Sequence, residues 1–310
     1  MTHITTLPGS SDNENVPIIS TTDAEDALFA VLDPYRAAKA GIYIDCTHGE
    51  QYRNGGAGDA PSGFQLLELL GGRRFRVGLG AGTVGAGRHP WIATDDVTSQ
   101  PVLMFGAGGS GGNTIAFGSD LENPSIVVNG AEANRLPLFD PAAGFTMAAA
   151  VRVPTPSTTV NGQLWPATTG GVILGSCAAS PKSPSLEVIY GSGNARMRPR
   201  QDAGPTTAVG DSANHANSQW LRLVATYNRS LNRGRIWVNG AAYIETTSMA
   251  QIYGDDPAGL LPRIGGLGST ALTSRFIGIL GTLICVPAPI AEDDATRALF
   301  DARLLERVTP

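Results

Sequence analysis

Two alternating runs joined by a short turn constrain the fold more than any other part of the chain. They span residues 219–240, with the sequence QWLRLVATYNRSLNRGRIWVNG. Apolar side chains alternate with other types in both runs, which is typical of strands with one buried face. The turn residues, 228–234, include Asn, Ser and Gly, which suit tight turns, and Asn239-Gly240 is a strong hairpin dipeptide. The segment therefore predicts a β-hairpin in an antiparallel sheet.

Short runs of the same kind recur along the chain, at the spacing typical of an all-β sandwich. After residue 100 they lie at 102–105, 114–117, 125–128, 145–153, 171–174, 186–190, 195–199, 220–227, 235–238, 262–264 and 276–286. Earlier runs lie at 42–46, 64–70 and 73–79. The composition agrees, because 39 glycines, 21 prolines and 16% charged residues suit turns better than helices.

Four of these segments resemble the laminin G-like, concanavalin A-like jelly-roll family. They are the hairpin itself, the FTMAAAV strand at 145–151, the PRIGG strand at 262–266 and the closing run at 276–286. The resemblance covers about two-thirds of the chain and implies an all-β jelly-roll sandwich. The chain departs from the family pattern at Asn228, at Ala150 and in the closing strand, which lacks the usual acidic residue.

Three parts are expected along the chain. Residues 1–21 are polar and predict a flexible N-terminal arm. Residues 22–100 predict an α+β segment that packs on or joins the main sheet, and residues 101–310 predict the jelly-roll domain. A helix capped at Thr22 is expected to break or restart at Pro34. A C-terminal helix is expected over 290–308.

Charge and composition exclude several classes of function. The net charge of -5 gives no basic surface for nucleic acid, and no apolar run approaches the roughly 20 residues that span a bilayer. The N-terminus shows no signal-peptide pattern. Three widely spaced cysteines predict buried free thiols in a protein made in the cytoplasm.

The sequence also predicts that the chain is not an enzyme. Two GxGxxG patterns, at 80–85 and 106–111, lack the following helix of a dinucleotide site. Glycosidases need two carboxylates close together, whereas Glu187 stands alone on its run and is expected at the solvated surface. The four histidines are scattered over predicted loops and are expected at the surface. No catalytic residue is therefore assigned.

Aromatic and planar polar side chains suggest a ligand-binding surface instead. The candidates are Trp165, Tyr190, Asn194, Arg196, Arg198, Trp237 and Tyr243. Aromatic faces and planar polar groups together hold sugars, but aromatics also dominate protein cores. Both interpretations of these aromatics remain open from the sequence.

Asp255 and Asp256 are the best candidates for a metal, because Ca²⁺ binds several oxygens from loops. Asp211 and Asn214 offer a partner loop. The alternative is that adjacent acids before a proline simply form a turn. No other cofactor is expected.

The main functional hypothesis is a structural protein of a virus particle, of the bacteriophage decoration, head-fibre or tail-associated kind. The family resemblance, the absent signal peptide and the polar arm motivate it. The expected partners are other virion subunits, reached through residues 1–21, in a homo-oligomer located in the virion. The alternatives are a carbohydrate-binding module or adhesin for cell-surface glycans and, third, a polysaccharide hydrolase.

Overall fold

The structure is a computed structural model of the 310-residue chain. It describes residues 4–5, 19–20, 22–47, 52–53, 65–67, 69–70, 74–78, 91–106, 125–128, 143–176, 184–199, 208–247, 249, 262–266 and 276–310.

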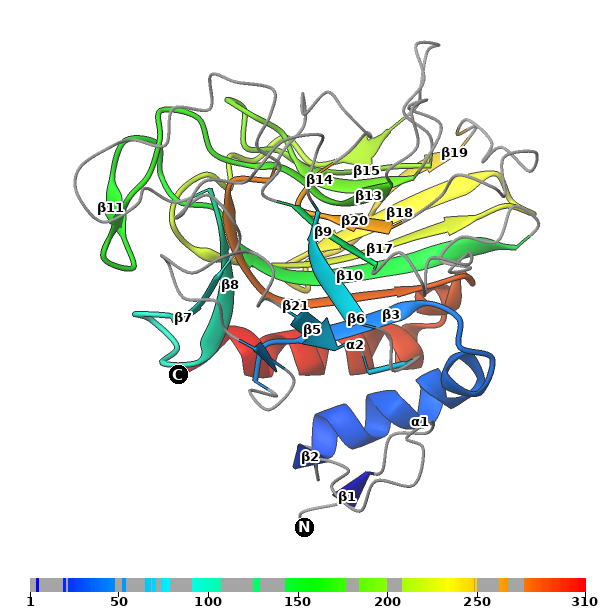
Figure 1. Ribbon diagram of the computed structural model, residues 1–310. Helices are drawn as coiled ribbons and strands as arrows, with labels where there is room; N and C mark the ends of the chain where they lie inside the picture. The colour runs from blue at the N-terminus through cyan, green and yellow to red at the C-terminus, as the bar shows by residue number, and fades with distance from the viewer. Residues whose placement is uncertain are drawn as a thin grey trace.

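Two antiparallel sheets face each other (Figure 1). The first sheet has eight described strands in the order β19-β18-β17-β10-β21-β8-β7, and β3 also pairs with β21. Their bounds are β3 (Ile42–Asp45), β7 (Trp91–Thr94), β8 (Pro101–Phe105), β10 (Gly144–Arg152), β17 (Trp220–Asn228), β18 (Arg233–Val238), β19 (Ile244–Thr247) and β21 (Gly278–Val286). The non-consecutive order means that the chain crosses between distant segments to build this sheet.

The second sheet has nine described strands in the order β16-β15-β14-β13-β20-β9-β6-β5-β4. Their bounds are β4 (Tyr52–Arg53), β5 (Gln65–Leu67), β6 (Arg74–Gly78), β9 (Ser125–Val128), β13 (Gly171–Ser176), β14 (Ser185–Val188), β15 (Ala195–Arg198), β16 (Val209–Gly210) and β20 (Pro262–Ile264). Two further pairs are β1 (Ile4–Thr5) with β2 (Ile19–Ser20), and β11 (Thr159–Val160) with β12 (Gln163–Leu164).

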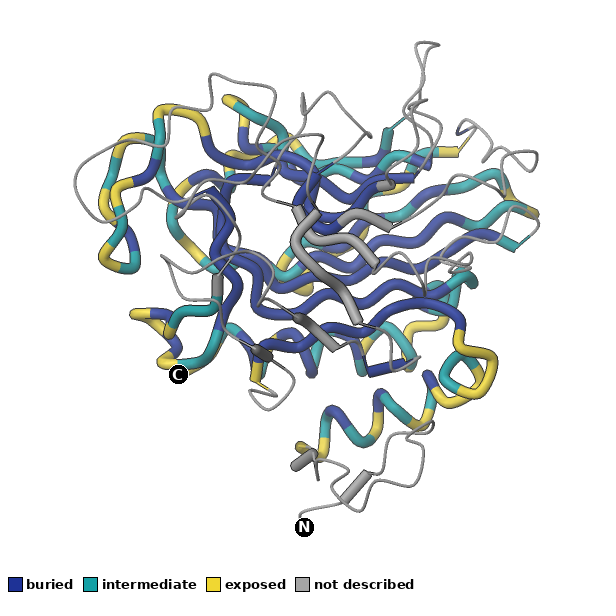
Figure 2. The backbone as a smooth tube through the Cα atoms, in the orientation of Figure 1, coloured by how far each residue is buried: buried dark blue, intermediate teal, exposed yellow. Residues whose placement is uncertain are grey.

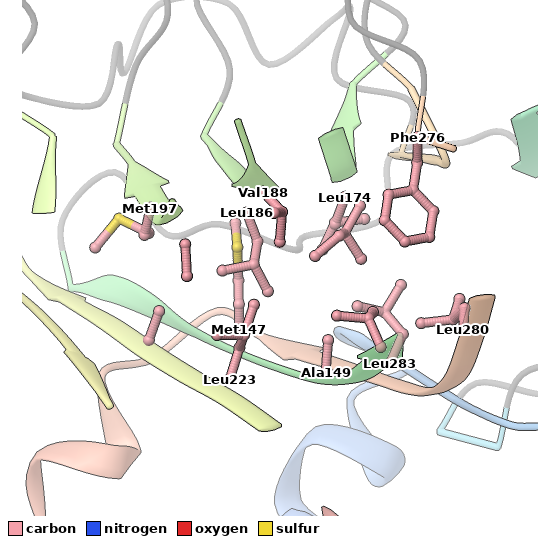
Figure 3. Close-up of a cluster of buried hydrophobic side chains, with 14 of the residues drawn as sticks. Met147, Ala149, Leu174, Leu186, Val188, Met197, Leu223, Phe276, Leu280 and Leu283 are labelled. Carbon is pink, nitrogen blue, oxygen red and sulfur yellow. The ribbon is translucent and has the colours of Figure 1, made fainter. Parts of the chain in front are cut away.

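The main core lies between the two sheets. Figure 3 shows Leu186 and Met197 of the second sheet directed toward Met147 and Leu223 of the first. Side chains alternate between faces because the strand period is two, so Ala148, next to Met147, lies in a different cluster, on the far side of the first sheet. Figure 2 shows the resulting burial along β10 and β21.

Helix α2 (Asp294–Val308) covers the far side of the first sheet, after the short 3-10 turn η3 (Ile290–Glu292). Phe300 and Leu304 are fully buried there, against Ala148, Val224 and other residues of the first sheet. The first sheet is therefore buried on both faces, which explains the nearly continuous apolar sequence of β21. Leu305 of the same helix is exposed.

Helix α1 (Asp23–Ala37) packs beyond α2 (Figure 1). The predicted cap is confirmed, since the Thr22 hydroxyl accepts a hydrogen bond from the backbone amide of Glu25 at 3.2 Å. The expected break at Pro34 is wrong, because α1 runs through this residue. Pro34 lies one turn before the helix end, where its missing N–H removes a single helical hydrogen bond.

The all-β fold class and both terminal helices are confirmed, and so is the central hairpin. In the hairpin, β17 pairs with β18, and Asn239 closes β18 with a positive φ of 54°. Strands from residues 22–100 lie in both sheets. The run expected at 114–117 lies outside the described residues.

Cys46 and Cys285 are buried, as expected, while Cys177 lies outside the described residues. Among the helices that the structure describes, none is long and apolar enough to cross a membrane.

Candidate functional site

The β14–β15 hairpin places three charged side chains on the outer face of the second sheet. Its apolar residues, Leu186, Val188, Ala195 and Met197, point into the core. The residues between them on the same two strands, Glu187, Arg196 and Arg198, must therefore point the opposite way. Glu187 and Arg196 are directly opposite each other in the antiparallel register. The alternation of each strand thus builds a polar group on the side away from α2.

A single oxygen of Glu187 contacts both arginines. Glu187 Oε1 lies 2.8 Å from Arg196 Nε and 2.9 Å from Arg198 Nε. The first contact is the direct cross-strand pair, and the second is the diagonal neighbour, within reach of long side chains. We call Arg196 and Arg198 the arginine pair. Glu187 therefore accepts a hydrogen bond from Arg196 Nε and forms an ion pair with Arg198 Nε, which has no hydrogen bond of its own among the described residues.

The arginine pair carries more charge than Glu187 neutralises. Two guanidinium cations meet one carboxylate, so the three side chains together carry one net positive charge. Burial lowers the pKa of Arg198, and Glu187 opposes this shift by raising it. A guanidinium nevertheless stays protonated in proteins. Among the described residues, Glu187 is the only hydrogen-bonding or ion-pair partner of the arginine pair.

This leaves the terminal amino groups of two planar forks for another acceptor. A guanidinium fork matches the two oxygens of a carboxylate, and such charge-assisted hydrogen bonds are stronger than neutral ones. The arrangement is therefore chemically suited to hold a planar anion at the outer face of the second sheet.

The loop after β16 packs against the turn between β14 and β15. Asn194 donates from Nδ2 to the carbonyl of Ala213 at 3.0 Å, and Asp211 Oδ1 accepts from the backbone amide of Ala195 at 3.0 Å. His215 Nε2 contacts Asp211 Oδ2, and both side chains are mostly buried. The expectation of a surface His215 is therefore wrong. These contacts give Asn194 and Asp211 structural partners beside the arginine pair.

The aromatic candidates do not form one surface. Trp165 is only 1% exposed, and its indole Nε1 donates to the carbonyl of Val160 at 3.0 Å. It packs with Met104 and Ile279, and Tyr190 packs partly against the same cluster. The core interpretation of aromatics therefore holds for Trp165, and its expected place on an exposed surface is corrected.

Trp237 and Tyr243 lie on the opposite side of the sandwich from the arginine pair. Trp237 is 4% exposed and packs in the cluster beneath α2, while Tyr243 is 48% exposed. Their ring centroids are 5.7 Å apart, and the Arg235 guanidinium lies 4.3 Å from the Tyr243 centroid. Ile236 faces the core, so Trp237, its neighbour, must face outward toward the helix. The seven predicted residues are thus divided between separate places.

The metal candidates Asp255 and Asp256 lie outside the described residues. Both carboxylate oxygens of Asp211, from the proposed partner loop, already have partners, namely the backbone amide of Ala195 and the ring of His215. Within the part of the chain that the structure describes, no three side chains of the His, Cys, Asp and Glu types gather as metal ligands.

Sequence reasoning missed the role of Glu187, which was expected at the solvated surface. Its side chain is mostly buried between two arginines. A signal was present in the sequence. Ser185 and Glu187 are two positions apart on one strand, and Arg196 and Arg198 are two positions apart on the next, so each pair lies on one face of the sheet. Opposite charges at matching positions of a hairpin predict a cross-strand pair on one face.

A second group of charges is buried between the helices and the first sheet. Arg303 of α2 donates to Asp45 Oδ2 at 2.7 Å and to the Tyr43 hydroxyl at 2.9 Å. Tyr43 in turn donates to Glu25 Oε1 of α1 at 2.6 Å. Arg307 Nε lies 3.3 Å from Asp45 Oδ1. Because these groups connect α1, β3 and α2 and are fully paired, we assign them a structural role.

The pKa of Asp45 is lowered by this pairing. Burial alone raises the pKa of Asp45, but the Arg303 and Arg307 guanidinium groups lower it more, together with hydrogen bonds from Thr282 and Thr47. The result is a pKa of about 2, against 3.8 for an ordinary aspartate. Asp45 is therefore a stable anion in the folded protein.

Solved structures similar to this chain include sialidases and one of their carbohydrate-binding modules. The CBM40 module of the Ruminococcus gnavus IT-sialidase, bound to alpha2,3 sialyllactose, matches with a TM-score of 0.40 and 12% identity, over 51% of this chain and 83% of that chain. The Trypanosoma rangeli sialidase in complex with 2,3-difluorosialic acid matches with a TM-score of 0.41 and 12% identity, over 86% and 33%. The NanB sialidase from Streptococcus pneumoniae matches with a TM-score of 0.38 and 12% identity, over 49% and 23%.

These likenesses are too distant to bear on function. No protein-family model matches the sequence, and the search of curated proteins finds no match either.

Proposed function

We propose that this protein is a carbohydrate-binding module that holds an acidic glycan through the arginine pair on the outer face of its second sheet. One observation carries the proposal: Glu187 Oε1 holds Arg196 Nε at 2.8 Å and Arg198 Nε at 2.9 Å, which leaves two forks and one positive charge for a ligand. Carboxylates of acidic sugars are planar acceptors of the kind that such forks bind.

The proposed role is binding without cleavage. A retaining glycosidase needs one carboxylate as nucleophile and another as acid, about 5–5.5 Å apart. Glu187 is instead engaged as the counter-ion of two guanidinium groups. Its pairing supports a part in holding the arginines, and the proposal assigns no catalytic residue.

The direct test is calorimetric titration with acidic and neutral polysaccharides, using the double variant R196A/R198A. The native protein is expected to bind an acidic polymer, such as a polyuronate, more tightly than a neutral glucan. Binding of the acidic polymer should weaken as ionic strength rises, because partly exposed charges are screened by salt. R196A/R198A is expected to lose this binding.

Two single variants on the opposite side of the sandwich serve as controls. R235A removes an arginine that also pairs with a glutamate, Glu245, at 2.6 Å. Y243A removes the exposed aromatic of the other predicted surface. Both are expected to keep the affinity of the native protein. Unchanged binding in R196A/R198A, or lost binding in Y243A alone, would place the site elsewhere.

Light scattering of the polymer tests the absence of cleavage. Polymer length should stay constant during incubation with the protein, and shortening would overturn the non-catalytic proposal.

The virion hypothesis, with its partner subunits and homo-oligomer, remains a prediction from the sequence. The same light-scattering measurement on the protein alone gives its mass. A defined oligomer that binds none of the glycans would favour an assembly role over glycan binding.

A further inference from the structure

We infer that Glu187 sets the charge class of the ligand, so that the arginine pair prefers a single negative charge, such as a sugar carboxylate, over a dianion such as a sugar phosphate. The inference rests on the proposed function, since it concerns the same site. It goes further by giving Glu187, which the sequence placed at the solvated surface, the role of a specificity residue.

The argument starts from the arrangement of the three side chains. Both arginines reach the same oxygen of Glu187, so the carboxylate lies between them rather than beside one of them. A ligand that engages both forks must approach this carboxylate closely. Glu187 is mostly buried, and water screens its charge less than it screens a surface charge.

Charge balance then separates the two kinds of ligand. A monoanion brings the total charge of the site and ligand to zero. A dianion leaves one uncompensated negative charge in a partly buried place, and it also loses more hydration on binding. The repulsion by Glu187 is proportional to the charge of the ligand and is twice as large for the dianion, and the attraction by the two arginines doubles as well. The larger loss of hydration of the dianion, with the Glu187 repulsion offsetting part of the attraction, therefore decides the preference for the monoanion.

This proportionality gives a quantitative expectation for E187Q. The variant keeps the size of the side chain and one acceptor oxygen while removing its charge. If the affinity for a monoanion rises by about 5-fold, the affinity for a dianion should rise by about the square of that factor, roughly 25-fold. A purely structural role for Glu187 predicts a different result, namely a similar loss for both ligands.

The experiment titrates three small probes into the full chain by calorimetry at pH 8. Methyl glucuronide is the monoanion, glucose 6-phosphate is the dianion at this pH, and methyl glucoside is neutral. The native protein is expected to bind the glucuronide best. E187Q is expected to gain affinity for both anions, with the larger gain for the phosphate and no change for the glucoside.

E245Q is the matched control. Glu245 also pairs with an arginine, at 2.6 Å, but on the edge of the first sheet. Its substitution makes the same change in net charge, so unchanged affinities in E245Q would show that the effect of E187Q is local.

The double variant E187Q/R198Q keeps the test decisive if E187Q folds poorly. It removes one charge of each sign and restores a net charge of +1. Its ratio of phosphate to glucuronide affinity should return to the native value, even if both affinities fall.

Equal fold-changes for the two anions in E187Q, or a native preference for the phosphate, would overturn the inference and leave the proposed function standing. A native protein that binds no acidic sugar or polymer would overturn the proposed function itself.

Discussion

Single residues with buried charge connect the ends of this chain to its sandwich. Asp45 on β3 is fully buried and is held by Arg303 and Arg307 of α2. The sequence predicts the helix that carries these two arginines. Their burial depends on which face of α2 meets the first sheet, which the helix sequence by itself does not reveal.

Replacing Asp45 by Asn is therefore expected to destabilise the protein strongly. The change removes the carboxylate that Arg303 and Arg307 share, and it leaves the buried Arg307 without an anion among the described residues, while Arg303 keeps Glu25 and Glu306. Breaking such a buried pair typically costs about 3–5 kcal/mol. Urea denaturation of D45N and the native protein measures the loss. The control is D33N, which removes the exposed partner of Arg36 and should cost at most about 1 kcal/mol. Similar losses in the two variants would contradict the structural role of Asp45.

The pH dependence of stability follows from the same residue. The folded pKa of Asp45, about 2, lies below its unfolded value of 3.8. A depressed pKa stabilises the folded state above the unfolded pKa, and this contribution, about 2 kcal/mol, is lost as pH falls from about 4 through 2. Urea denaturation between pH 2.5 and 6 should show this loss in the native protein. D45N should lack this part of the dependence, and parallel curves for the two proteins would argue against it.

At the scale of the element, both described α-helices begin at a side-chain cap. Asp293 accepts a hydrogen bond from the backbone amide of Thr296 at 2.7 Å at the start of α2. This hydrogen bond lowers the pKa of Asp293. The cap is thus the first of two adjacent acids, Asp293 and Asp294.

D293A is expected to destabilise the protein, because it leaves a helix N–H without its acceptor. D294A is the matched control, since the Asp294 side chain is 91% exposed and contributes only through the helix dipole and an exposed ion pair with Arg297 at 3.6 Å, both of which are weak at the surface. Thermal unfolding of the two variants compares the losses, and a larger loss in D294A would show that the cap is misassigned.

At the scale of the whole molecule, the N-terminal helix is an outer layer on the sandwich. Its buried residues Leu28 and Leu32 pack in the cluster that also holds Phe300 of α2. Glu25 adds the hydrogen bond with Tyr43. Helix α1, helix α2 and the first sheet therefore share one apolar cluster and one group of buried charges.

Two truncations test this dependence. Removal of residues 1–21 keeps Thr22, the cap of α1, and should leave the unfolding temperature nearly unchanged. Removal of residues 1–40 takes away α1 and its buried leucines, each worth about 1.5–3 kcal/mol. The unfolding temperature should then fall by several degrees, at about 2–4 °C per kcal/mol. Equal unfolding temperatures in calorimetric scans would show that α1 contributes no stability.

The sequence by itself determined the elements that depend on neighbours along the chain. The alternation around Ile236, the Asn239-Gly240 turn and the Thr22 cap all follow from periods and short-range hydrogen bonds. For the same reason the all-β class and both helices were predictable, and Glu187 with its arginine pair was within reach of a register argument.

Only the tertiary structure decided which faces meet. β10 pairs with β17 on one edge and with β21 on the other, although residues 148, 224 and 284 are far apart in the sequence. This choice buries Trp237 beneath α2 and places the arginine pair on the opposite side. Long-range packing is set by the total apolar area that the chain buries, a quantity that no local pattern contains.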